Sequence, residues 1–140
     1  MAAADFGNGS RVDLAIGIGS EGLATQGAVA VIFAGRDGLA AAKNQLWSQD
    51  TSGILDARES DDRFGHSLAA ADLGRSTQAD LVVGIPGEST AQLELVGAAG
   101  VIYGSTNGLT AVGNQLWSQD SPGIRAVASC LCSSLNGAAS

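Results

Sequence analysis

The heptapeptide Asn-Gln-Leu-Trp-Ser-Gln-Asp occurs twice in this chain, at residues 44–50 and again at residues 114–120. The two copies are 70 residues apart, and the glycine-led segments 27–33 and 97–103 match each other with the same spacing. Self-similarity at a fixed spacing is the sequence signature of a repeat architecture. The chain of 140 residues therefore contains two copies of one structural unit.

The spacing between the copies changes once along the chain. Residues 13–18 match residues 80–85 with a spacing of 67, so the second copy carries three additional residues between Ile85 and Gly97. We interpret the additional residues as a loop insertion, because the segments on both sides of it still match.

Each copy has the same succession of short apolar segments separated by turn residues. The hairpin residues Asn107-Gly108, and Asp37-Gly38 in the first copy, tolerate a positive φ. Short strands bounded by turns at this spacing predict an antiparallel meander. We therefore expect an all-β fold built from two four-stranded β-propeller blades. In the second copy the expected strands are residues 64–73, 81–85, 98–103 and 115–119.

The predicted boundaries assign residues 1–56 to the first blade, 57–125 to the second and 126–140 to a degenerate first strand of a further repeat. The first blade lacks most of its own first strand. Two interpretations stay open. Strand exchange and self-association would complete the ring, and three chains would supply six blades, within the range of about 4–8 that propellers use. Alternatively, the chain is a fragment of a propeller with further blades. In either case, the acidic residues Glu59, Asp61 and Asp62 are expected to form a solvated connection between the blades.

Composition and charge exclude several classes of protein. With 45% apolar residues the chain is too hydrophobic for a disordered acidic tail. A net charge of −7 argues against a nucleic-acid binder, because phosphate binding needs a basic surface. No apolar run approaches the roughly 20 residues that span a bilayer, so we expect no transmembrane segment. The first ten residues show neither a basic nor an apolar region, so we expect no signal peptide in this chain.

The ordered motifs resemble the FG-GAP repeats of the integrin α-chain N-terminal β-propeller, and more closely those of bacterial proteins carrying this repeat. Phe64-Gly65 is similar to the first half of the motif, and Gly84-Ile85-Pro86 is similar to the second half, whereas Gly17-Ile18-Gly19 lacks the proline. The resemblance implies a non-enzymatic binding module for cell adhesion or extracellular ligand recognition, outside the cell or on its surface. It also implies a protein or glycan ligand.

The same resemblance implies calcium in the loop between the first and second strands of each blade. Calcium takes 6–8 oxygen ligands. The implied ligands are Asp5, Asn8 and Asp13 in the first loop and Asp72, Ser76 and Asp80 in the second. Only the first and last aspartates of the family pattern persist in both loops. The alternative is that each aspartate pair accepts hydrogen bonds from loop amides and holds the turn.

Trp47 and Trp117 occupy the same position in the two copies. A repeated tryptophan can stack on sugars, which gives the alternative function of a lectin-like propeller assembled from several chains. It can equally fill the space between neighbouring blades.

We expect no catalytic residues and no organic cofactor. His66 is the one imidazole, and its neighbours Ser67 and Asp72 do not make a triad by being close in sequence. Residues 17–22 spell a dinucleotide-binding glycine motif, but a strand rather than the required helix is expected after them.

Overall fold

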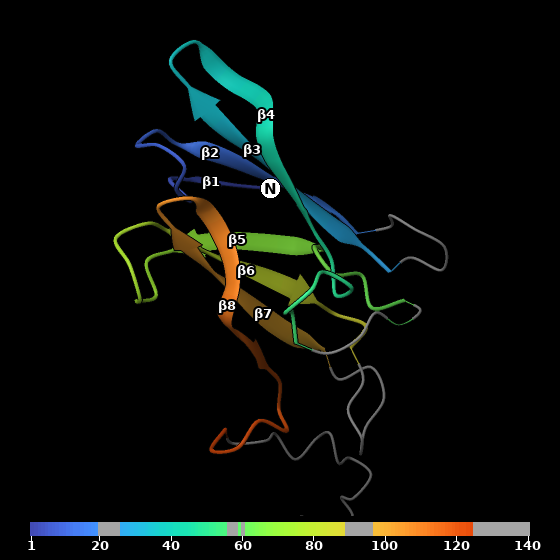
Figure 1. Cartoon of the computed structure of the whole chain (residues 1–140). Coiled ribbons are helices and arrows are strands. Elements are labelled where there is room, and N and C mark those ends of the chain that lie inside the picture. The colour runs from blue at the N-terminus through green and yellow to red at the C-terminus, as the bar shows by residue number, and fades with distance from the viewer. Residues whose placement is uncertain (20–25, 56–58, 60, 89–96, 125–140) are drawn as a thin grey trace, which may run out of the picture.

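The computed structural model describes residues 1–19, 26–55, 59, 61–88 and 97–124. This part of the chain forms two four-stranded antiparallel sheets, in the orders β1-β2-β3-β4 and β5-β6-β7-β8 (Figure 1). The all-β prediction is confirmed, with no helix among the described residues. The strands are β1 (Ala2–Ala4), β2 (Asp13–Ile18), β3 (Ala28–Gly35), β4 (Gly38–Trp47), β5 (Ser67–Ala71), β6 (Asp80–Ile85), β7 (Ala98–Ser105) and β8 (Gly108–Trp117).

The two sheets share one register. Leu14 pairs with Ile32 in the first sheet, and the equivalent Leu81 pairs with Ile102 in the second. Both sheets also have an irregularity at the same place, after Val31 in β3 and after Val101 in β7. The repeat in the sequence is therefore a repeat of strand order, pairing and bulge.

The fourth strand of each sheet is where the sequence-based boundaries were wrong. We expected residues 115–119, but β8 begins at Gly108, directly after a two-residue turn. Gly108 and Gly38 have φ values of 107° and 110°, which side-chain-bearing residues rarely adopt. Most of β4 is exposed, so its start carries no apolar alternation that would have marked it as a strand.

The first strands differ between the sheets. β1 has three residues and β5 has five, which is also shorter than the expected segment 64–73. Residues 126–140, the predicted first strand of a further repeat, lie outside the described residues, as does most of the predicted insertion before Gly97. The strand exchange therefore stays a prediction.

The sheets lie beside each other, with β1 and β5 in contact (Figure 1). The Phe64 backbone N–H donates to the Gln26 carbonyl oxygen at 3.0 Å, which ties the start of the second sheet to the first. One apolar core is shared by both sheets. It contains Phe6, Ala15, Val29, Val31, Phe33, Trp47, Phe64, Leu81, Val83, Ile85, Ile102 and Leu109. Among the described residues, no helix is long and apolar enough to cross a membrane.

Candidate functional site

The loop between β1 and β2 is held by two aspartates. Asp13 is buried at the start of β2. Its Oδ2 accepts a hydrogen bond from the Phe6 backbone N–H, and its Oδ1 accepts one from that of Ala34, both at 2.9 Å. Asp5 Oδ1 accepts from the Gly7 backbone N–H at 3.0 Å. Asp13 thus joins the end of the loop to β3. Burial raises its carboxyl pKa above 3.8, although both backbone N–H groups act to lower it.

The loop between β5 and β6 repeats these bonds. Asp80 is fully buried and accepts from the Leu73 backbone N–H at 2.7 Å and from that of Gly104 at 2.9 Å. Asp72 Oδ1 accepts from the Gly74 backbone N–H at 3.1 Å. In both loops, the aspartate pair makes the amide bonds that were the alternative to calcium ligation.

The other two residues implied as calcium ligands also make hydrogen bonds. Asn8 has a φ of 61°, and its Oδ1 accepts from Lys43 Nζ at 3.4 Å. Ser76 Oγ donates to the Gly104 carbonyl oxygen at 2.9 Å. Calcium binding by the two loops stays a prediction.

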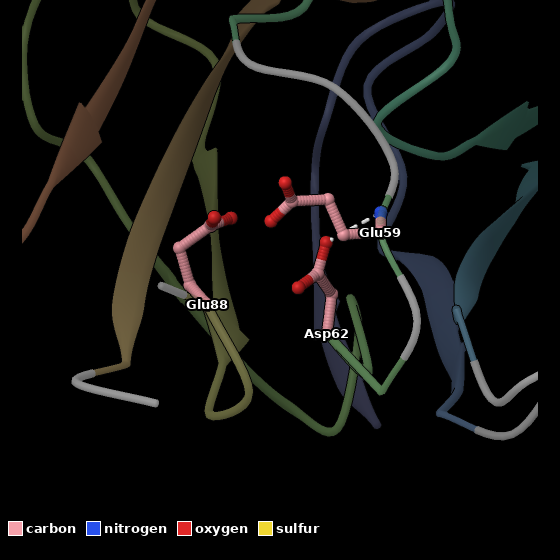
Figure 2. Close-up of side chains that lie close together, drawn as sticks. All are labelled: Glu59, Asp62 and Glu88. Carbon is pink, nitrogen blue, oxygen red and sulfur yellow. Dashed lines mark hydrogen bonds between the residues drawn. The ribbon is translucent and has the colours of Figure 1, made fainter. Parts of the chain in front are cut away.

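A cluster of three carboxylates lies between the sheets, formed by Glu59, Asp62 and Glu88 (Figure 2). Their oxygens lie within 4.8 Å of one another and face a common point. Asp62 Oδ2 accepts a hydrogen bond from the Glu59 backbone N–H at 2.7 Å. Glu59 is exposed, but Asp62 and Glu88 are buried. The expectation of a solvated connection is therefore wrong for Asp62, whose side chain is 1% exposed.

Gln49, in the heptapeptide that ends the first sheet, reaches this cluster. Its side chain is 3% exposed, and its Nε2 donates to Glu88 Oε2 at 2.7 Å. Its Oε1 is the one buried side-chain polar atom without a hydrogen-bond partner among the described residues. Carboxylate and amide oxygens are ligands that hard divalent cations take. The group also links the two repeat copies directly, through the bond from Gln49 to Glu88.

Sequence reasoning missed Glu88, although a signal for it was present. Glu21 stands 67 residues before Glu88, at the same place after the second strand of the first copy. Glu21 itself lies outside the described residues.

The two repeated tryptophans lie in different surroundings. Trp47 is 6% exposed, and its Nε1 donates to Gln45 Oε1 at 3.3 Å. Trp117 is 41% exposed, and its Nε1 donates to Gln115 Oε1 at 3.0 Å. The ring of Trp47 is packed in the core shared by the two sheets. The ring of Trp117 lines an open groove of about 360 Å³. The groove is also lined by Leu55, Asn114, Gln115, Leu116, Ser121 and Pro122.

Comparison with known proteins gives one partial similarity. No family model matches the sequence. Over 111 residues the chain is 32% identical to the phosphatidylinositol-glycan-specific phospholipase D of Rattus norvegicus. The match covers 77% of this chain and 13% of the rat protein. The chain is thus similar to a small part of that protein.

Proposed function

We propose that the two sheets are adjacent blades of a β-propeller that serves as a non-enzymatic binding module of the integrin α-chain FG-GAP type. The observation that carries the proposal is the packing of two sheets with the same strand order, register and bulge around a shared core. Propellers are built by this kind of repetition, in which each four-stranded sheet packs on the next.

The proposed role is cell adhesion or extracellular ligand recognition, outside the cell or on its surface. The loops 5–13 and 72–80 support this role, because buried aspartates fix both of them to the strands behind. Loops held by a rigid scaffold are the common location of binding residues. The test is adhesion of cells to immobilised protein, with the heat-unfolded chain as control. Equal adhesion to the folded and unfolded chains would contradict the proposal.

The partial similarity to a phospholipase raises the question of hydrolysis. The matched segment is 13% of that enzyme, and we propose that it does not carry the phospholipase D reaction. We expect this chain to release no protein from a phosphatidylinositol-glycan anchor in a phase-partition assay. The positive control is an active phosphatidylinositol-glycan-specific phospholipase D. Release above the buffer control would overturn the non-enzymatic assignment.

Calcium stays part of the proposal, located in the loops 5–13 and 72–80. The measurement is the melting temperature in calcium and in chelator. A calcium-induced rise that Asp72→Asn removes and Glu59→Gln leaves intact would assign the ion to a loop. The reverse pattern would assign it to the carboxylate cluster, and no rise would remove calcium from the account.

A lectin-like propeller is the second candidate, favoured by the exposed indole of Trp117 at a groove. The neighbouring amides are already engaged: Gln115 Oε1 accepts from Tyr103 Oη at 3.1 Å, and Asn114 Nδ2 donates to the Gly53 carbonyl oxygen at 2.6 Å. A glycan array with wild-type protein and Trp117→Ala decides this point. Sugar binding that the substitution abolishes would favour the lectin.

A further inference from the structure

Each blade has two faces, defined by residues that pair side by side across its strands. The front face of the first blade contains Ala15, Val29, Val31, Gln45 and Trp47, which neighbour one another in the register of β2, β3 and β4. It packs toward the second blade, and its four apolar members are buried.

The front face of the first blade packs against the back face of the second blade. This face contains Leu81, Val83, Ile102, Leu109 and Leu116, and the first four of these are at most 4% exposed. The contact between the front face of one blade and the back face of the next is therefore present once within the chain.

The front face of the second blade has the same residue pattern and is open around Trp117, while Val101 on the same face is 7% exposed. Ala99 pairs with Trp117, as Val29 pairs with Trp47 in the first blade. Trp117 is 41% exposed where Trp47 is 6% exposed, and Ala99 is half-buried where Val29 is fully buried. The residue pattern is repeated at this face, but among the described residues Trp117 is not buried by a neighbouring sheet as Trp47 is.

The back face of the first blade is open in the complementary way. Leu39 is 52% exposed, whereas the equivalent Leu109 is 4% exposed. Leu46 is 64% exposed, whereas Leu116 is half-buried. Large apolar side chains grouped on one exposed face indicate an interaction surface.

The polar contacts inside the chain indicate which partner fits the open faces. Gln45 Nε2 donates to the Leu109 carbonyl oxygen at 3.0 Å, and the Leu109 backbone N–H donates to Gln45 Oε1 at 3.2 Å. Gln115 on the open front face and Leu39 on the open back face are the repeat equivalents of these two residues. Gln115 Nε2 can therefore donate to the Leu39 carbonyl oxygen of a second copy, whereas its Oε1 already accepts from Tyr103 Oη and Trp117 Nε1.

We propose that the open front face of the second blade binds the open back face of the first blade of a second copy of this chain. This inference rests on the proposed function, because it extends the blade packing of a propeller from one chain to the next. The contact is head-to-tail, so repeating it generates a ring if the rotation closes. With two blades per chain, rings of about 4–8 blades hold two to four copies.

The test is the mass in solution by light scattering for the wild type, Trp117→Arg and Leu39→Arg. The wild type should have two to four times the chain mass of 13.9 kDa. Each arginine substitution blocks one face and should lower the mass to that of a single chain. Val112→Arg is the matched control, because Val112 is 73% exposed on β8 and its equivalent in the first blade, Ala42, is also exposed.

Mixing the two blocked variants tests the orientation. Trp117→Arg keeps an intact back face and Leu39→Arg keeps an intact front face, so an equimolar mixture should form a species of two chains. Both substituted residues are exposed within one chain, and circular dichroism should show that each variant folds like the wild type.

A monomeric wild type, or a wild-type mass in either blocked variant, would overturn the inference. So would glycan binding by a monomeric wild type that Trp117→Arg abolishes, since the face would then take sugar. Cell adhesion by a monomeric wild type would overturn this inference alone. Assembly without adhesion would count against the binding role alone.

Discussion

Removing the carboxylate of Asp80 tests whether the loop aspartates hold the fold through backbone amides. In Asp80→Ala the backbone N–H groups of Leu73 and Gly104 both lose their acceptor, at a residue that is fully buried. A buried donor left without a partner costs about 1–3 kcal/mol, which applies to the Gly104 N–H. The Leu73 N–H is only part-buried and adds about 1 kcal/mol or less, so we expect a total loss of about 1–4 kcal/mol. Domains of this size are stable by roughly 5–15 kcal/mol, so the loss is a large fraction of the total.

The assay is urea unfolding in the presence of chelator, followed by tryptophan fluorescence. The matched control is Asp72→Ala, which removes one bond from the exposed Gly74 backbone N–H and should cost about 1 kcal/mol or less. A loss below about 1 kcal/mol for Asp80→Ala would refute the reasoning. A loss that appears only when calcium is present would show that the carboxylate acts through a bound ion instead.

Further predictions concern the same two sheets. Burial raises the pKa of Asp13 above 3.8, so the folded state holds this proton more tightly than the unfolded chain does. The free energy of unfolding of the wild type should therefore fall relative to that of Asp13→Asn as the pH rises from 3.8 toward neutrality. The measurement is urea unfolding at several pH values, and a rise in the wild-type value relative to Asp13→Asn would contradict this. Leu109→Ala should lower the free energy of unfolding by about 2–5 kcal/mol, because the side chain is buried in the core shared by the two sheets. Gly38→Ala should cost about 1–3 kcal/mol by the same assay through its positive φ alone. Gly108→Ala should cost more, because its added Cβ would lie 2.8 Å from an aromatic carbon of Phe33 in the first sheet, and equal losses would contradict this reasoning.

The local pattern of the sequence was sufficient to predict the two sheets and their middle strands. The apolar residues of β6 and β7 are grouped where these strands enter the core, and this grouping marks them in the sequence. The predicted bounds of both strands were therefore close to the observed ones. β4 is exposed along most of its length, and an exposed strand needs no apolar alternation. Its start was visible only through the glycine that follows the hairpin turn.

The surroundings of individual side chains were not predictable from the local sequence. Trp47 and Trp117 stand in identical heptapeptides, yet one is buried and the other exposed, because the neighbouring sheet decides burial. The carboxylate cluster likewise depends on contacts between segments far apart in the sequence. Asp62 and Glu88 come from separate loops, and Gln49 reaches them from the first repeat copy.

The most direct test of the central claim is electron microscopy of the purified chain in its assembled state. The account predicts a closed ring around a central axis, with an even number of blades between about four and eight, since each chain contributes two. Assembled particles without radial repetition would contradict the closed ring of blades.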